Sequence, residues 1–468
     1  MKSKRLLQNS TSVDAEQKQR CRGCESTGNN IGDRGSQSFP AKVSSGVSFN
    51  PHPNYWRIAG KYYDLTDFMH KHPGGLQLIQ MSQDRFDDAT FAFEAHHHNY
   101  KKARAILHRY YVGDVDGSER QTDEAGEQYP KFLLDDKSFY SVLRKRVTAY
   151  FKECGGCGGS WAAPGPTQEC VVLFWSLFVL WMNSFVYCVY SGTVQSALLC
   201  GLFATWLGAF GHNWVHQPKY RFWATLSLDT VGFSSEAWYR DHVLQHHMYT
   251  NTPKDNHFKG TNPFLITDPT VKRSWVQRHI TPYLTPLILT FGMWGNYIVH
   301  TVSLLKGEEP LHWGKIILPM EIGIMVYHWG WAWGLALMYT MYAILGIYYF
   351  TLALMNHNAE HCSDVKRRND SRDWAEAQLN SSADWGVDFS FFQSIIYLWL
   401  NYHTVHHLFP HVDMSRHMGI QAILIKTCKE FDIEYVAGNP ATIWKEMLHN
   451  FSTPHSLFKI INTYSGAF

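Results

Sequence analysis

Histidine is concentrated in four short stretches of this sequence. They read GHNWVHQ, DHVLQHHMY, NHNAEHC and NYHTVHHLFP, and they begin at residues 211, 241, 356 and 401. On a helix, residues four apart lie on one face, so histidines at that spacing converge. Imidazole is a ligand for Zn, Cu, Fe and Ni, and four clusters offer more ligands than one ion accepts. The pattern therefore predicts two metal ions with open coordination positions.

Long apolar runs must position these clusters. Residues 171–190 and 194–210 each approach the roughly 20 residues that a helix needs to cross a bilayer. Only a few residues separate them, so they predict a hairpin of two spans. Residues 316–355 fit two more spans of about 19 residues each. The run 283–305 contains Pro and Gly and is expected to lie in the membrane interface. Four spans return the chain to its starting side, which brings all the clusters together.

Composition and charge agree with a membrane protein. Of the 468 residues 15% are aromatic, with 18 Trp, and such residues favour the lipid interface. The formal charge of +2 is too small to predict nucleic-acid binding. Lys and Arg gather in the His-bearing blocks and are absent from 191–193 and 330–335, so the histidines are expected to face the cytosol. Nine Cys, two of them in apolar runs, do not predict a disulfide scaffold. The Cys-x-x-Cys pairs at 21–24 and 154–157 offer only a weak zinc alternative.

A compact polar unit precedes the apolar runs. The stretch IAGKYYDL alternates around Gly60 as a small hairpin would, helical segments continue to Tyr110, and YVGDV closes the unit near residue 115. Residues 1–48 are rich in Ser, Gly, Gln and charge and are expected to be disordered. Residues 117–169, which include CGGCGG, are expected to form a flexible linker, and 446–468 a C-terminal tail.

Residues 170–445 resemble the membrane fatty acid desaturase superfamily. The boxes HxxxH, HxxxHH and HxxHH, the paired spans and the LFPH continuation carry the resemblance. In that family the boxes hold two Fe ions that use O₂ and two electrons to remove two hydrogens from an acyl chain. The second box has one more intervening residue than the commonest HxxHH. His361 matches a further family ligand, and His357 stands where some members hold a metal-bound water. The resemblance implies as ligands His212, His216, His242, His246, His247, His403, His406 and His407.

Residues 49–116 resemble cytochrome b5. The segments YYDLTDFMHKHPGG, DATFAFEAHHHN and YYVGDV carry this resemblance. It implies heme b held by His72 of HPGG and by a second histidine from 96–98, with His97 preferred and His98 as the fallback. It also implies that electrons from NADH or NADPH arrive through a separate cytochrome b5 reductase and pass from the tethered heme domain to the iron pair.

The sequence thus predicts an α+β cytochrome b5-like domain followed by an all-α polytopic membrane domain. That domain is expected to have four transmembrane helices and a cytosolic His-rich cap in the endoplasmic reticulum membrane. The expected reaction is O₂-dependent desaturation of a fatty acyl chain, carried as acyl-CoA or phospholipid. Because the third box of front-end desaturases usually begins with Gln, His403 favours a non-front-end enzyme. Front-end desaturation, hydroxylation on the same site, and a heme electron carrier with an inactive di-iron site are the alternatives.

Overall fold

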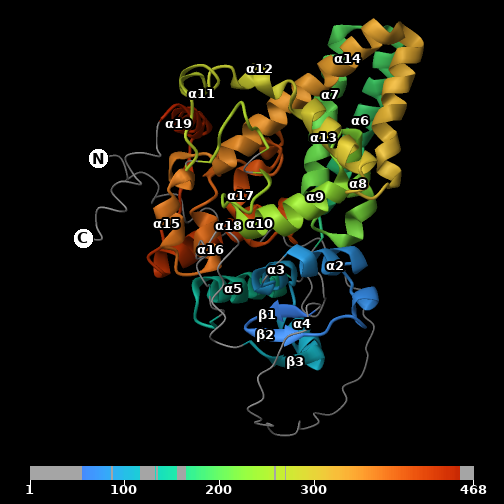
Figure 1. Ribbon diagram of the computed structural model, residues 1–468. Helices are drawn as coiled ribbons and strands as arrows, with labels where there is room; N and C mark the ends of the chain where they lie inside the picture. Colours follow the sequence, from blue (N-terminus) through green and yellow to red (C-terminus); the bar gives the residue numbers. More distant parts are fainter. Residues whose placement is uncertain are drawn as a thin grey trace.

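The computed structural model describes residues 55–85, 88–115, 132, 135–154, 165–257, 260–268 and 270–453. The segment predicted to be disordered, 1–48, lies outside these ranges, as do three of the four cysteines in the Cys-x-x-Cys pairs. Figure 1 shows an N-terminal unit at the bottom, a column of long apolar helices at the upper right, and a C-terminal helical cap beside that column.

The N-terminal unit is built on a three-stranded antiparallel sheet in the order β1-β2-β3. Its strands are β1 (Trp56–Ile58), β2 (Lys61–Tyr63) and β3 (Tyr111–Asp114). The hairpin predicted around Gly60 is confirmed: Ala59 and Gly60 turn the chain with φ of 52° and 69°. The helical segments between β2 and β3 are η1 (Met69–Lys71), α2 (Leu76–Arg85), α3 (Thr90–His96), α4 (Tyr100–Leu107) and η2 (His108–Tyr110).

The segment predicted to be a flexible linker contains an ordered helix, α5 (Phe139–Glu153), so that prediction is wrong for these residues. Ser138 caps the helix by accepting a hydrogen bond from the backbone N–H of Ser141. One face of α5 is buried and includes Tyr140, whose hydroxyl donates to the carbonyl of Leu408 in the cap. The helix therefore joins the N-terminal unit to the cap.

The two apolar runs before residue 215 form the expected helical hairpin. Helices α6 (Gln168–Ser191) and α7 (Val194–Trp214) are long and apolar enough to cross a membrane. Thr167 and Thr193 cap their N-termini, and Gly192 ends α6 in the left-handed conformation with φ of 59°. Small residues let α7 pack closely: a side chain on Gly201 would collide with the backbone carbonyl of Met341.

The run 316–355 does not form two spans of equal length. It lies in one element, α14 (Ile317–His357), interrupted at Gly330, where φ is 71° and ψ is 170°. Figure 1 shows its two limbs meeting at a sharp bend at the top. The limb 317–329 is about 20 Å long, shorter than the roughly 30 Å hydrocarbon core. In the described residues three helices, rather than four, are long and apolar enough to span a membrane.

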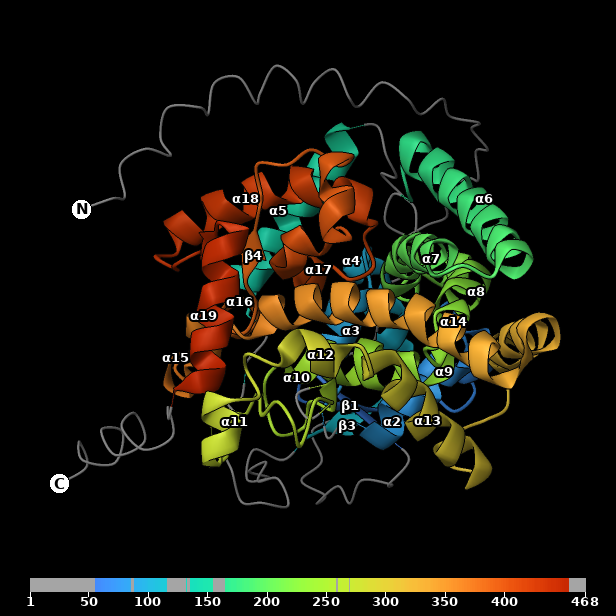
Figure 2. The ribbon, with the colours of Figure 1, turned by 90° about the horizontal axis from the view of Figure 1, so that it is seen from above.

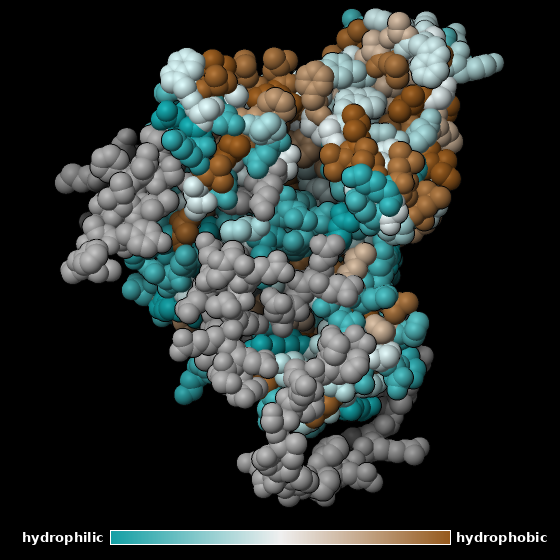
Figure 3. All heavy atoms as spheres, in the orientation of Figure 1, coloured by the Kyte–Doolittle hydropathy of each residue, from teal (hydrophilic) through white to brown (hydrophobic). Residues whose placement is uncertain are grey.

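Residues 275–305 form short helices with strongly exposed apolar side chains. These are α11 (Trp275–His279), α12 (Thr285–Leu289) and α13 (Gly292–Leu305). Tyr283 is 72% exposed and Leu305 is 81% exposed, and both would meet lipid rather than water if the segment lies in the interface. In Figure 3 hydrophobic residues gather on the upper half of the molecule, away from the N-terminal sheet.

The cap surrounds the ends of α7 and α14 with short segments, as Figure 2 shows from above. Before residue 275 they are η3 (Pro218–Tyr220), α8 (Arg221–Thr230), α9 (Ser235–Trp238), the π-helical η4 (Tyr239–His246) and α10 (His247–Tyr249). The segment η6 (Trp313–Ile316) leads into α14. After α14 come η7 (Glu360–Ser363), α15 (Val365–Asn369), α16 (Trp374–Leu379), β4 (Asp384–Trp385), η8 (Gln393–Tyr397), η9 (Leu400–Tyr402), α17 (His403–Leu408), η10 (Met414–Arg416), α18 (His417–Glu430), β5 (Ala437–Gly438) and α19 (Pro440–Ser452).

Candidate metal centre and heme pocket

The histidine clusters meet where the membrane helices enter the cap. His212 is in the last turn of α7, and His357 is the last residue of α14. His216 lies in the turn that follows α7, and the remaining histidines of these groups come from η4, α10 and α17. Both helix ends therefore lie on the cap side, as the predicted return of the chain to one side requires.

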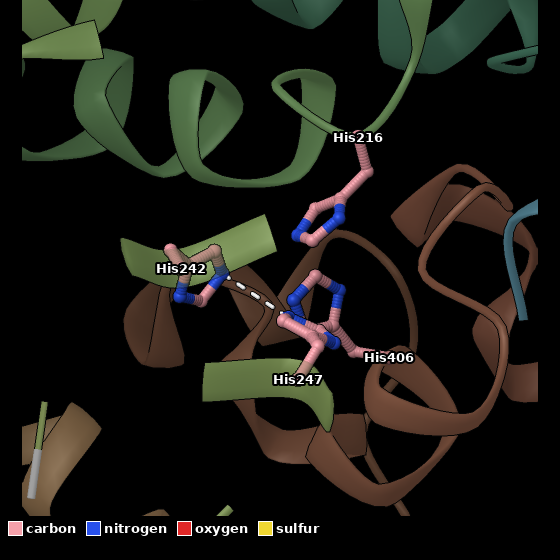
Figure 4. Close-up of side chains that lie close together, drawn as sticks. All are labelled: His216, His242, His247 and His406. Carbon is pink, nitrogen blue, oxygen red and sulfur yellow. Dashed lines mark hydrogen bonds between the residues drawn. The ribbon is translucent and has the colours of Figure 1, made fainter. Parts of the chain in front are cut away.

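Their ring nitrogens form two groups of four, each able to hold a metal ion. Within each group the ligand atoms lie within 4.8 Å of one another. We call the first group site A; it consists of His216, His242, His247 and His406. We call the second group site B; it consists of His246, His357, His403 and His407. Figure 4 shows the four imidazoles of site A converging from the end of α7, from η4 with α10, and from α17.

The extra residue in the second box is accommodated by a π-helix. In η4 the backbone winds more loosely than an α-helix, with hydrogen bonds between residues five apart. His242 and His247 are five residues apart, and their Nε2 atoms lie 3.2 Å from each other. The longer spacing therefore keeps His242 directed at the same point as His247.

Nitrogen separations in both sites fit metal coordination. Two nitrogens bound at right angles to one ion, each about 2.1 Å from it, lie about 3 Å apart. In site B, Nε2 of His357 lies 3.1 Å from Nε2 of His246 and 2.8 Å from Nε2 of His403. His212 lies beside site A, with its Nε2 2.9 Å from Nε2 of His242.

Unpartnered buried nitrogens give an independent test of the fit. Both ring nitrogens of His216, Nε2 of His406, and Nδ1 of His242, His247 and His403 are buried without a hydrogen-bond partner. A bound metal would satisfy nitrogens of His216 and His406, because buried polar atoms cost free energy when nothing binds them. In His242, His247 and His403 the unpartnered atom is Nδ1, and it is Nε2 that converges with the other rings. Burial lowers the pKa of these five imidazoles well below the ordinary value, so they are neutral and keep a lone pair for a metal. The donor set therefore fits a pair of transition-metal ions.

Polar side chains and carbonyls orient three ligands of site B. Nδ1 of His246 lies 2.9 Å from a carboxylate oxygen of Asp255, which is buried in the loop after α10. Nδ1 of His407 donates to the amide oxygen of Gln378 at 3.0 Å. Nδ1 of His357 donates to the carbonyl of Ser381 at 2.9 Å. Each bond directs Nε2 towards the other ligands, which is how outer partners orient metal-binding histidines.

His357 and His361 lie in positions that differ from those expected of them. The sequence implied a direct ligand at His361 and a water-mediated contact at His357. His357 instead belongs to site B, whereas Nε2 of His361 lies 2.9 Å from the carbonyl of Ser382 and belongs to neither group. The reason is local: α14 ends at His357, and the next turn, η7, redirects the chain.

His257 is a clustered histidine that the sequence reasoning missed. It forms a third group with His242 and His246, and its ring stacks on that of His246 with centroids 4.9 Å apart. It follows η4 and α10 in a loop, with no i, i+4 partner of its own. Asp255, two residues earlier, was the available signal, because a carboxylate and a histidine close to the HxxxHH box are typical metal-site chemistry.

An aromatic wall, to which α14 contributes Tyr349, lies beside site A. Trp238 lies 4.8 Å from the ring of His242, and Phe233 packs against both Trp238 and Tyr349 with centroid distances of 4.3 and 5.4 Å. All three side chains are buried. These three rings therefore form apolar packing between site A and the core of the membrane helices.

In the N-terminal unit, His72 and His97 face each other. Their ring centroids are 5.9 Å apart with an interplanar angle of 69°. Two imidazoles bound to opposite faces of one iron, each nitrogen about 2 Å from it, have ring centres about 6 Å apart. Nδ1 of His97 donates to the carbonyl of Phe93 at 2.7 Å, which leaves its Nε2 free for an iron. The pair therefore fits the two axial positions of a heme.

The surroundings of this pair also suit a heme. Gly74 must be small, since a Cβ there would lie 2.7 Å from Cε1 of His72. The rings of Phe68 and Phe93 contact His72 and His97 and supply apolar walls. Burial, followed by the neighbouring His97, lowers the pKa of His72 to about 4, so its imidazole is neutral. The fallback ligand His98 points elsewhere, towards His411 and Phe151.

Comparison with protein families agrees with both units. The family model described as fatty acid desaturase matches residues 191–439, which is more than half of the chain. The model described as cytochrome b5-like heme/steroid binding domain matches residues 44–116. The chain therefore belongs to the fatty acid desaturase family and carries a fused cytochrome b5-like domain. It is an oxidoreductase, a fatty acid desaturase.

Several relatives share this arrangement along most of the chain. The acyl-lipid (8-3)-desaturase of Physcomitrium patens is 27% identical, and the match covers 91% of this chain and 93% of that protein. The acyl-lipid (8-3)-desaturase of Mortierella alpina is 26% identical and covers 83% and 90%. The cytochrome b5-related protein of Drosophila melanogaster is 26% identical and covers 80% and 83%.

These relatives do not support one interpretation of the third box. His403, in place of the usual Gln, favoured a non-front-end enzyme, but the two (8-3)-desaturases are front-end desaturases. In the structure His403 contributes Nε2 to site B, so its identity is explained by the metal site.

Proposed function

We propose that this protein is an O₂-dependent acyl desaturase whose two iron ions are held by sites A and B. The observation that carries the proposal is the convergence of eight imidazoles, in two groups of four, at the cap ends of α7 and α14. The ligand set is site A with His212 beside it, and site B with His357 in place of His361. When bound, the iron pair supplies the oxidising power that removes two hydrogens from an acyl chain.

The chain's own residues bind, orient and shield the reacting region. An acyl chain enters from the membrane helices and lies along the wall formed by Phe233, Trp238 and Tyr349. Burial of that wall and of the imidazoles excludes water from the reacting carbons. Asp255 and Gln378 hold His246 and His407 in place while the substrate binds.

The fused domain, with boundaries near 49–116, supplies electrons from a heme b held by His72 and His97. Those electrons come from NADH or NADPH through a separate cytochrome b5 reductase. The domain packs against the cap, with Phe91 stacked on Trp374 at 5.5 Å, so delivery takes place within one molecule.

The protein lies in the endoplasmic reticulum membrane with the heme domain and both sites facing the cytosol. Basic residues near the cap and their absence from 191–193 and 330–335 support this orientation. In this arrangement α6 and α7 cross the bilayer, the two limbs of α14 enter and return, and 275–305 lies in the interface. The desaturase domain then extends over about 170–445.

The substrate is a fatty acyl chain, carried as acyl-lipid or acyl-CoA, and the new double bond is of the front-end type. The support for this regiochemistry is the likeness to two acyl-lipid (8-3)-desaturases over most of the chain. A front-end enzyme acts between an existing double bond and the carboxyl end, so a chain already containing double bonds is the substrate to supply.

The test is fatty acid analysis of yeast that expresses the full chain and is fed polyunsaturated fatty acids. The expected result is a new double bond on the carboxyl side of an existing one, absent when His403→Ala is expressed. His403→Ala should keep the heme spectrum, because His403 and the heme pocket lie in different units. A hydroxylated product, or a product that survives His403→Ala, would contradict the proposal.

A further inference from the structure

Three consecutive histidines at the C-terminal end of α3 face three different neighbours. His97 faces His72 in the heme pocket. His98 lies 5.8 Å from His411 of the cap, measured between ring centroids. His96 faces site A: its ring stacks on that of His216 with centroids 6.1 Å apart and an interplanar angle of 24°. The residue next to a heme ligand therefore contacts a residue of the metal centre.

The His96 ring has no other evident task. Its Nδ1 lies 2.9 Å from the carbonyl of Ala92, a bond that fixes the ring orientation. Its Nε2 is buried and has no hydrogen-bond partner. Burial lowers the pKa of His96, so the ring is neutral in the contact. His96 is not a member of site A, because that group of converging nitrogens consists of His216, His242, His247 and His406.

We propose that His96 lies on the route by which electrons pass from the heme pocket to site A. The route runs through His97, His96 and His216. The inference rests on the proposed function and adds the route within the molecule. Each transfer oxidises the heme iron from ferrous to ferric and reduces one iron of the pair from ferric to ferrous. Two such transfers, with O₂ and two protons, balance the removal of two hydrogens from the acyl chain and the release of two water molecules.

The contact is held by a buried interface rather than by chance proximity. Glu94, two residues before His96, forms an ion pair and hydrogen bonds with Arg144 of α5, and both side chains are buried. Nδ1 of His411 donates to the carbonyl of Ala95 at 2.7 Å. These bonds involve the two residues that precede His96 and keep the end of α3 fixed against α5 and the cap. Because a fixed ring–ring contact shortens the gap between the two centres, it favours electron transfer.

The experiment is single-turnover reoxidation of the reduced heme in the full-length holoprotein, followed by stopped-flow absorbance after mixing with O₂ and acyl substrate. The variants are His96→Gln, His96→Phe and the matched control His98→Gln, which alters the same interface outside the path. We expect His96→Gln to slow heme reoxidation by more than an order of magnitude, and His98→Gln to leave it nearly unchanged. His96→Phe should recover most of the rate, because it keeps an aromatic ring against His216.

Heme spectrum, heme reduction potential and iron content are measured on each protein and should match the wild type. Reoxidation of His96→Gln at the wild-type rate, or equal slowing by His96→Gln and His98→Gln, would overturn the inference. If His96→Gln loses heme or iron, the heme reoxidation rates of His96→Leu and His96→Phe are compared instead. The inference predicts the slower rate in His96→Leu, which lacks an aromatic ring. Wild-type heme that is not reoxidised in a substrate-dependent manner would instead refute the proposed function, so the two failures are distinct.

Discussion

Site A and site B use similar ligands but differ in what holds those ligands. In site B, three of the four imidazoles have a hydrogen-bond partner on Nδ1, and one of these partners is the carboxylate of Asp255. In site A, His216 has no partner on either nitrogen, and Nδ1 of His242 and His247 is also unpartnered. Site B is therefore oriented by polar groups, and site A chiefly by packing.

The difference indicates how the two halves of the centre divide their tasks. A histidine oriented by a carboxylate is a more basic and better fixed ligand, so site B should hold its metal more tightly. Site A lies beside the aromatic wall and beside His96 of the heme domain. The less constrained site thus faces both the proposed substrate path and the proposed electron donor.

The largest expected effect concerns membership of site B. His357→Ala should abolish desaturation and lower the iron content, because it removes a nitrogen that lies 2.8 Å from Nε2 of His403. The matched variant His361→Ala should keep most of the activity, since that ring contacts a carbonyl outside both groups. Product formation and iron content are measured on the two purified variants. A larger loss in His361→Ala than in His357→Ala would show that His361, rather than His357, is the ligand.

Asp255→Asn should weaken iron binding by about 10–100-fold, the usual cost of losing an outer carboxylate. Burial raises the pKa of Asp255, but His246, His257 and the backbone N–H of Asn251 together leave it below the ordinary value. Iron affinity is measured by competition with a chelator of known strength. The control is Asn256→Ala, which changes an exposed neighbour bonded to Asp241. Equal affinities in Asp255→Asn and the wild type would remove the distinction between the sites.

Metal removal should proceed in two steps. A chelator is expected to take the ion of site A first, because its imidazoles lack outer partners, and the ion of site B later. Non-heme iron remaining on the protein is followed over time while the heme spectrum serves as an internal reference. In Asp255→Asn the two steps should approach one another. A single step in the wild type would show that the sites hold iron equally well.

The smallest expected effect comes from Gln378→Ala. The amide oxygen of Gln378 accepts from His407 at 3.0 Å and from Thr250 at 2.9 Å. Bonds to a neutral acceptor are roughly half as strong as bonds to a charged one, so the loss of iron affinity should be less than about tenfold. The same chelator competition measures it. A larger loss than in Asp255→Asn would mean that the carboxylate is not the main support of site B.

The sequence predicted the two units and most of the histidines that converge in the structure. Histidine spacing indicated the clusters, and the family resemblance supplied the expected ligand set. The i, i+4 pairs and the HPGG turn are local patterns that can be recognised in a short segment. The convergence of His212, His242 and His403 was inferred separately, from the return of the spans to one side. The exchange of His357 and His361 depends on where α14 stops, and helix ends are not fixed by apolar pattern.

Other features depend on contacts that a pattern does not contain. Helix α5 was not predicted, because the Gly-rich stretch CGGCGG that follows it favoured a linker. Its signals were Ser138, a good helix cap, and buried residues that repeat at helical spacing. His257 lies in a loop, and only the fold brings it to His246. The bend at Gly330 divides 316–355 unequally, and its position depends on a left-handed glycine that hydropathy does not detect.

The most direct test of the account is the metal content of the purified full-length protein, with heme and non-heme iron measured separately. The account predicts one heme and two non-heme iron ions per chain, with the non-heme iron reduced in His403→Ala and the heme retained. Non-heme iron near zero, zinc in its place, or unchanged iron in His403→Ala would contradict the assignment of sites A and B.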